Sequence, residues 1–140
     1  MADSPKVTGI LETSLYVADV ERAKSFYQSL FDFELLLEDD RLCALAVDGR
    51  QVLLLFRKLS SVNSVETPGG TIPGHDGSGE MHVAFSIAPS QFEEWRKRLQ
   101  EQNVAIESAV RWPRGGESLY FRDLDNHLIE LATPGVWSIY

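Results

Sequence analysis

The chain has 140 residues, with 13 basic against 21 acidic side chains and a formal net charge of −8. This acidic surplus argues against nucleic acid or an anionic membrane as a partner, because both attract basic patches. No apolar run approaches the roughly 20 residues that cross a bilayer. Met1–Lys6 contains no apolar signal core, and the single cysteine, Cys43, excludes an internal disulfide. We therefore expect a globular protein of the cytoplasm.

An internal repeat aligns residues 11–18 with residues 81–88. In both segments large apolar residues alternate with other types, which predicts half-buried strands. Glu12 and His82 occupy equivalent positions on the face opposite the large apolar residues. The chain is therefore expected to consist of two related units.

Each predicted strand is followed by a predicted helix with an apolar stripe on one face. In the first unit Asp19 is placed as the N-cap. In the second unit Ser90 and Glu93 have the spacing of a capping box. Neither helix is apolar all round, so each should cover one face of a sheet.

Three more strands are predicted in each unit, at residues 33–38, 41–47 and 51–57 and at residues 105–111, 118–122 and 127–132. The prediction is an α+β fold of two βαβββ modules, residues 9–58 and 79–133, forming a curled mixed sheet in one domain over residues 1–140. The helices would lie on the outer face. The linker, residues 59–78, is rich in Ser, Thr, Pro and Gly. A long connection without regular structure is usually functional or mobile.

Ionisable residues at matched positions predict a metal site on the helix-free face. Strand interiors disfavour carboxylates, so Glu12 and His82 need a reason to be there. Alternation in the last strand puts Glu130 on the same side, whereas the first unit has Leu53 or Leu54 at the equivalent position. One imidazole and two carboxylates suit Mn²⁺, Mg²⁺, Fe²⁺ or Ni²⁺ at least as well as Zn²⁺. The alternative is that each residue is simply a solvated polar group in a wet groove.

Several further residues are candidates for binding substrate. Tyr120 and Ser118 share a face on the strand before Glu130, and Tyr16 lies on the inner face of the first strand. Arg114, in a Pro-Arg-Gly-Gly loop, suits a carboxylate substrate, and His75 in the linker suits a lid residue. Each has a structural alternative: the tyrosines could be half-buried aromatic residues of a strand, Arg114 part of a solvated loop and His75 a surface histidine.

Other residues are predicted to have structural roles or no chemistry. His127 faces away from the proposed metal, so we assign it a structural role. Cys43 has no base beside it in the sequence and is assigned no chemistry. Trp137 and Tyr140 are expected to pack on the domain or on a partner chain.

Segments of both predicted units resemble the vicinal-oxygen-chelate superfamily. That superfamily includes glyoxalase I, bleomycin-resistance proteins, fosfomycin-resistance thiol transferases, methylmalonyl-CoA epimerase and extradiol dioxygenases. Residues 11–27 resemble the opening of that family, and residues 82–85 and 118–131 resemble its second half. The resemblance implies two modules that curl into a cup around a metal, often completed by dimerisation. It also implies ligands at Glu12, His82 and Glu130.

The chain departs from the family pattern in three places. The first ligand position is usually His or Gln and here is Glu12, and a leucine replaces the Glu that glyoxalase I uses as a fourth ligand. The turn usually written Asp-Pro-Asp-Gly reads Asp-Leu-Asp-Asn at residues 123–126. The first two departures argue against an ordinary glyoxalase I. They also argue against an extradiol dioxygenase, which uses two His and one Glu.

The expected function is that of a homodimeric, divalent-metal-dependent enzyme acting on a small molecule. The metal would chelate two neighbouring substrate oxygens and stabilise developing negative charge such as an enolate. Glu12 or Glu130 would serve as base and Tyr120 as a helper donor. Lyase or isomerase chemistry is preferred over dioxygenase chemistry. The other candidate is a bleomycin-resistance-type protein that sequesters a compound without catalysis.

Overall fold

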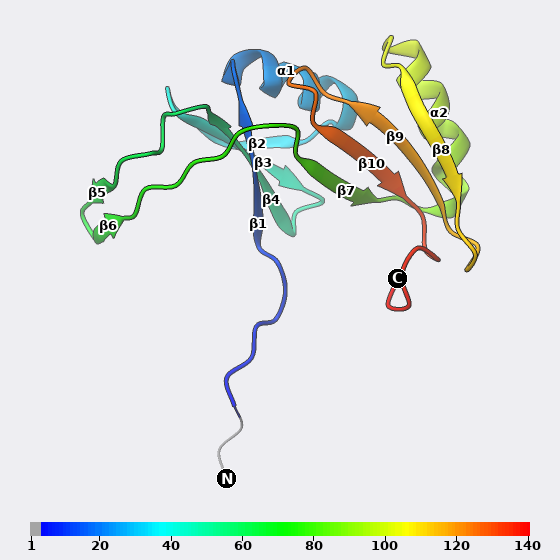
Figure 1. The fold of residues 1–140 in the computed structure, drawn as a ribbon, viewed down its shortest axis with the longest axis horizontal. Coiled ribbons are helices and arrows are strands. Elements are labelled where there is room, and N and C mark those ends of the chain that lie inside the picture. Colours follow the sequence, from blue (N-terminus) through cyan, green and yellow to red (C-terminus); the bar gives the residue numbers. More distant parts are fainter. Residues whose placement is uncertain (1–3) are drawn as a thin grey trace.

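The computed structural model describes residues 4–140, which form two four-stranded sheets and a small hairpin (Figure 1). The first module comprises β1 (Glu12–Val17), α1 (Val20–Phe31), β2 (Glu34–Glu38), β3 (Leu42–Val47) and β4 (Gln51–Arg57). The second comprises β7 (His82–Ser86), α2 (Phe92–Glu101), β8 (Ile106–Arg111), β9 (Glu117–Arg122) and β10 (Leu128–Ala132). The predicted α+β fold of two βαβββ modules is confirmed.

Both sheets have the same mixed topology. Their strand orders are β1-β4-β3-β2 and β7-β10-β9-β8, and in each sheet the first pair is parallel and the others are antiparallel. Ser14 lies opposite Leu54, and Ala84 lies opposite Glu130. Since Ser14 and Ala84 are equivalent in the repeat, the counterpart of Glu130 is Leu54. The other option, Leu53, is buried in the core.

The two helices begin differently. Asp19 caps α1 as predicted, because its Oδ1 accepts the backbone N–H of Arg22 at 3.1 Å. The capping box predicted for Ser90 and Glu93 is wrong, since no side chain caps α2. A 3₁₀ turn, Pro89–Gln91, leads into that helix instead and places Ser90 inside the turn. Neither helix in residues 4–140 is long and apolar enough to cross a membrane.

The two modules share one hydrophobic core. Side chains from the helix-facing sides of both sheets form one cluster with the apolar stripes of α1 and α2, including Leu15, Tyr27, Leu45, Leu99, Phe121 and Leu131. The Tyr27 hydroxyl donates to Asp123 Oδ2 at 2.6 Å across the module boundary. The helix-free faces of the sheets therefore remain available for other contacts.

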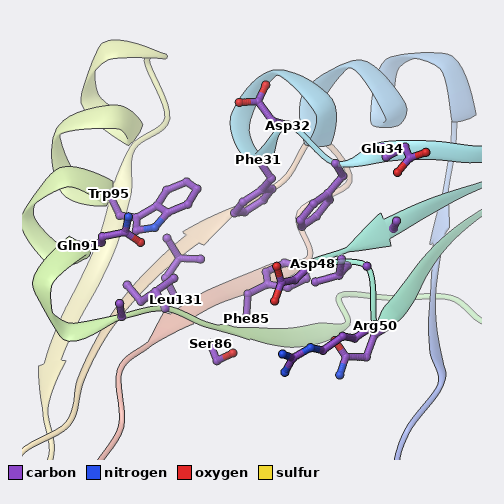
Figure 2. A pocket seen from close by; sticks show the side chains of 17 residues that line it. Phe31, Asp32, Glu34, Asp48, Arg50, Phe85, Ser86, Gln91, Trp95 and Leu131 are labelled. Carbon is purple, nitrogen blue, oxygen red and sulfur yellow. The ribbon is translucent and has the colours of Figure 1, made fainter.

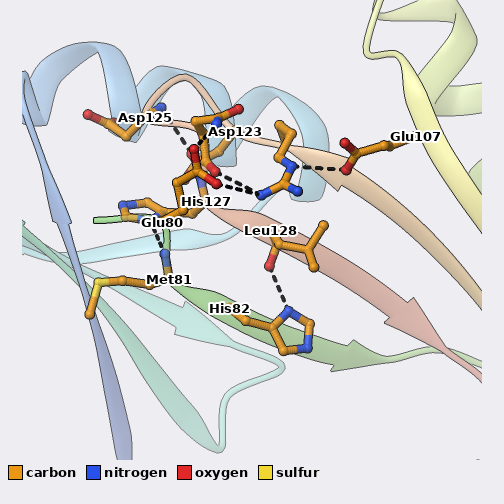
Figure 3. Close-up of polar contacts among 10 residues, drawn as sticks. Glu80, Met81, His82, Glu107, Asp123, Asp125, His127 and Leu128 are labelled. Atoms are coloured by element: carbon orange, nitrogen blue, oxygen red, sulfur yellow. Dashed lines mark hydrogen bonds and ion pairs between the residues drawn. The ribbon is translucent and has the colours of Figure 1, made fainter. Parts of the chain in front are cut away.

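His127 also joins the modules and has the structural role that its position predicted. The fully buried ring accepts the Met81 backbone N–H at Nδ1, at 2.9 Å, and Nε2 lies 2.7 Å from the Tyr16 carbonyl oxygen. Because a carbonyl only accepts, the ring proton lies on Nε2. Figure 3 shows the ring beside the start of β7.

The linker contains regular structure that was not predicted. Within residues 59–78, β5 (Val65–Thr67) and β6 (Gly70–Ile72) form an antiparallel hairpin that projects from one side of the molecule (Figure 1). The Thr67 hydroxyl donates to the Gly70 carbonyl at 2.6 Å, and Gly70 has a φ of 146°. Two short strands stabilised by such local contacts leave only a weak sequence pattern.

Candidate metal centre

His82 and Glu130 come together on the helix-free face of the second sheet. They lie on the adjacent parallel strands β7 and β10, and His82 Nε2 is 3.3 Å from Glu130 Oε1. Glu130 is only 6% exposed, whereas 48% of the His82 side chain is exposed. The prediction from alternation that these two side chains share one face is therefore confirmed.

The protonation of His82 follows from its second ring contact. Its Nδ1 lies 2.8 Å from the carbonyl oxygen of Leu128 (Figure 3), and a carbonyl only accepts, so Nδ1 carries a proton. When the ring carries only that proton, Nε2 presents a lone pair to the carboxylate of Glu130. Two such atoms attract each other only through a cation or a second ring proton between them. Ligand atoms about 2.1 Å from one metal ion lie roughly 3.0–3.4 Å apart, so the observed 3.3 Å fits a divalent ion.

A hydrogen-bonded relay fixes the Glu130 carboxylate. The Ser118 hydroxyl donates to Oε2 at 2.6 Å, and the Trp112 indole N–H donates to the Ser118 oxygen at 2.8 Å. The other oxygen, Oε1, is left to face His82. Partners of this kind orient metal ligands and tune their affinity.

Sequence reasoning missed Trp112, which directly follows the predicted strand at residues 105–111. Val110 of β8 lies opposite Ser118 of β9, so Trp112, two residues beyond Val110, has the same alternation. Extending the alternation of β8 by two residues would have placed Trp112 on the inner face beside Ser118.

Tyr120 lies on the same inner face, directly opposite Glu130 in the β9–β10 pair. Its ring stacks on that of His82, with centroids 6.4 Å apart. Burial, and then the negative charge of Glu130, raise the pKa of the Tyr120 hydroxyl. The hydroxyl therefore keeps its proton at neutral pH and can donate a hydrogen bond to an oxygen of a bound molecule.

Glu12, the third predicted ligand, does not join this pair within one chain. It is exposed at the start of β1, in the first sheet. Within residues 4–140, no three His, Cys, Asp or Glu side chains gather in a way that could hold a metal. A single chain thus brings together only two of the three predicted ligands.

The inner face of the first sheet is apolar. Its buried residues are Tyr16, Leu42, Ala44 and Phe56, and the partly buried Leu54 packs against them. The linker residue His75 packs on this face, with its Nδ1 hydrogen-bonded to the Tyr16 hydroxyl. Two predicted substrate-binding residues, Tyr16 and His75, therefore meet here and not beside the His82–Glu130 pair.

Arg114 and Cys43 lie apart from these groups. Arg114 is exposed in the turn between β8 and β9, and its guanidinium makes no ion pair or hydrogen bond within the described part of the chain. Cys43 is fully buried, and burial, followed by the charge of Glu38, raises the pKa of its thiol to about 11. The structure therefore gives the thiol a packing role.

A cavity of about 650 Å³ lies between the modules on their helix-bearing side (Figure 2). Its aromatic lining is Phe31, Phe33, Phe85 and Trp95, and charged side chains including Arg50 and Asp48 stand at its rim. Neither His82 nor Glu130 lines it. The cavity is thus separate from the candidate metal ligands.

Comparisons with known proteins agree with the family resemblance and with the fold. The sequence model of the Glyoxalase/Bleomycin resistance protein/Dioxygenase superfamily matches residues 9–131. Metallothiol transferase FosB of Staphylococcus saprophyticus is 29% identical, over 91% of this chain and 78% of that protein. FosB of Bacillus licheniformis is 27% identical, over 96% of this chain and 81% of that protein.

Solved structures match over nearly the whole chain. A lactoylglutathione lyase from Agrobacterium tumefaciens is 30% identical, with a TM-score of 0.87 and coverage of 96% of this chain and 99% of that one. The fosfomycin resistance protein FosX of Listeria monocytogenes, complexed with Mn(II) and sulfate, is 22% identical with a TM-score of 0.69, covers 94% of both chains, and supports the fold alone. The protein belongs to the Glyoxalase/Bleomycin resistance protein/Dioxygenase superfamily.

Proposed function

We propose that this protein is a divalent-metal-dependent enzyme of the cytoplasm that acts on a small molecule, and that its metal is shared between two chains. His82 and Glu130 of one chain and Glu12 of a second chain would hold the ion. The observation that carries the proposal is the contact between His82 Nε2 and Glu130 Oε1 at 3.3 Å. The ring proton of His82 lies on Nδ1, where it is donated to the Leu128 carbonyl oxygen. This geometry presents an imidazole lone pair and a carboxylate to one point.

A second chain is proposed because Glu12 is the repeat counterpart of His82 but lies on the other sheet, away from the His82–Glu130 pair of its own chain. It is the counterpart of His82, exposed on the inner face of the first sheet. A two-fold homodimer that sets the first sheet of one chain against the second sheet of the other would complete two identical sites. The nitrogen and oxygen donors suit Mn²⁺, Fe²⁺, Ni²⁺, Zn²⁺ or Mg²⁺.

The bound metal would chelate two neighbouring substrate oxygens and act as a Lewis acid towards developing negative charge. Tyr120, which keeps its proton, would donate a hydrogen bond to one of those oxygens. Ser118 holds Glu130 in place and is therefore a positioning residue. The Glu12 carboxylate makes no hydrogen bond or ion pair within the described residues, so it is the carboxylate freer to move and accept a substrate proton.

Lyase or isomerase chemistry is the reaction class that we propose first. The lactoylglutathione lyase, at 30% identity and a TM-score of 0.87, supports this choice. Thiol transfer is the second candidate, because metallothiol transferases are 27–29% identical to this chain. Either reaction would use the same positioned metal and donor in this protein.

The proposal can be tested by titrating Mn²⁺ into the wild-type protein and into Glu12→Ala, His82→Ala and Glu130→Ala by calorimetry. Each substitution should weaken binding at least about 100-fold, because each removes a ligand. Glu107→Ala, an exposed carboxylate on β8 that pairs with Arg122, is the matched control and should bind like the wild type. Equal metal binding by all of these proteins would overturn the proposal.

Mixing two inactive variants tests whether the site is shared. A hybrid dimer of Glu12→Ala with His82→Ala contains one site with all three ligands and one with only Glu130. Mixed and re-equilibrated chains should therefore recover tight Mn²⁺ binding at about a quarter of the sites, since half of randomly formed dimers are hybrid. No recovery would contradict the shared site.

A further inference from the structure

We propose that Tyr16, Arg41, Phe56 and His75 form a second subsite, which receives the carboxylate end of an elongated substrate. This inference rests on the proposed function, because the other end of the substrate would lie on the metal. It is carried by the way the linker seats His75 and by the unpaired guanidinium of Arg41.

The linker is built to seat His75 on the inner face of the first sheet. The His75 backbone N–H donates to the Ser61 carbonyl at 2.7 Å. A Cβ on Gly74 would lie 2.2 Å from the Val62 carbonyl oxygen, and one on Gly77 would lie 2.5 Å from the Tyr16 ring. Any side chain at either glycine would displace the loop. The close approach of the loop backbone to Val62 and to the Tyr16 ring therefore positions His75.

Tyr16 determines which nitrogen of His75 is offered to a ligand. Burial, and then the charge of Asp76, raise the pKa of the Tyr16 hydroxyl, which therefore keeps its proton. The hydroxyl is hydrogen-bonded to Nδ1 of His75, and in the tautomer with the ring proton on Nε2 the hydroxyl is the donor. His75 is exposed, so this Nε2–H is free to donate a hydrogen bond to a ligand.

Arg41 supplies a positive charge at the same place. Its guanidinium carbon lies 5.9 Å from the centroid of the Phe56 ring, and the His75 ring lies edge-on to Phe56 at 4.6 Å. Within residues 4–140 the Arg41 guanidinium forms no ion pair. A guanidinium and an N–H donor that both contact one aromatic ring can bind a single carboxylate between them. In a chain of net charge −8 it provides a local site for an anion.

The position along β1 sets the length of the substrate. Tyr16 lies four residues beyond Glu12 on the same face of the strand, which is about 13 Å at about 3.3 Å per residue. Val52 and Leu54 of β4 lie between them on that face. The substrate class is therefore a molecule with two chelating oxygens at one end, an apolar body of about six methylene groups and a carboxylate at the other end.

Two hydroxamates test this subsite with the Mn²⁺-loaded protein. Octanohydroxamate and suberic acid monohydroxamate share a two-oxygen chelating head and an eight-carbon chain, but only the second ends in a carboxylate. Calorimetry should show that wild-type protein binds the carboxylate probe about tenfold more tightly. Arg41→Gln and His75→Ala should abolish this preference while leaving octanohydroxamate and Mn²⁺ affinities unchanged.

Arg57→Gln is the matched control. Arg57 adjoins Phe56 in β4 but pairs with Val17 on the helix-covered face, so its loss should leave the preference intact. Equal affinity of the wild type for both probes, or a preference that survives Arg41→Gln, would overturn the subsite. Failure of octanohydroxamate to bind the Mn²⁺-loaded protein would instead overturn the proposed metal chemistry.

Discussion

The two modules have the same topology but opposite chemistry on their inner faces. Register pairs their positions as Glu12 with His82, Leu42 with Ser118, Ala44 with Tyr120, and Leu54 with Glu130. One face is an apolar wall with a carboxylate at its edge, and the other is a polar, hydrogen-bonded set. The core that the modules share uses the helix-facing residues of each sheet, so an inner face can diverge when the residues that pack together on it change together.

The largest expected effect comes from placing the glutamate of the second module at the equivalent position of the first, Leu54. Leu54→Glu places a carboxylate against Tyr16 and Phe56, where the counterpart of Ser118 is Leu42 and offers no hydroxyl. Urea unfolding should show a loss of about 3 kcal/mol, because the charge enters a partly buried apolar cluster that offers it no partner. Leu54→Met is the control and should cost less than about 1 kcal/mol. A stable Glu variant would show that the two faces are chemically interchangeable.

The contact that joins the modules should have the next largest effect. Tyr27→Phe removes the hydroxyl that donates to Asp123 across the module boundary. The free energy of unfolding should fall by about 2 kcal/mol, since a buried carboxylate loses a hydrogen bond. Tyr120→Phe, whose hydroxyl lies on the inner face, should change it by less than about 0.5 kcal/mol. Equal effects would mean that the Tyr27 contact contributes nothing to module association.

Ser118→Ala tests whether the relay belongs to the metal site or only to the fold. Without the Ser118 hydroxyl, Glu130 loses the bond that orients its carboxylate. Mn²⁺ affinity measured by calorimetry should fall about tenfold, the usual effect of removing a ligand-orienting partner. Ser108→Ala, on the neighbouring strand β8 and exposed, is the control. Unchanged affinity in Ser118→Ala would restrict the relay to a packing role.

The smallest effect concerns Cys43, whose counterpart in the second module is Leu119. Burial raises the pKa of its thiol from 9.0 to about 11, so the unfolded chain ionises first as pH rises. Stability attributable to this thiol is complete below pH 9 and is lost as pH rises towards 11. At pH 8, iodoacetamide should label folded protein about 100-fold more slowly than urea-unfolded protein. Equal labelling rates would contradict a core role.

Strand alternation was enough to predict the strands of the architecture and the shared face of two of the three proposed ligands. It placed His82 and Glu130 on one face, because two-residue periodicity survives in each strand regardless of what surrounds it. It could not place Glu12 relative to them, since that depends on how the two sheets sit with respect to each other. Trp112 was missed because it follows the strand, where alternation is rarely extended.

Local contacts explain the remaining errors. The hairpin of β5 and β6 depends on a few hydrogen bonds such as that from Thr67, which composition does not reveal. The capping box at Ser90 failed because Pro89 starts a tighter turn before the helix. In both cases a neighbouring residue determined the backbone path more strongly than the motif did.

The ring of His127 limits what can replace it. One end accepts the Met81 amide of one module, and the other donates to the Tyr16 carbonyl of the other. Among common side chains only the amides of asparagine and glutamine also carry a donor and an acceptor on two separate atoms, and they lack the rigid spacing of an aromatic ring. Evolution or design could therefore alter the chemistry of either inner face more freely than the His127 contact that aligns the two modules.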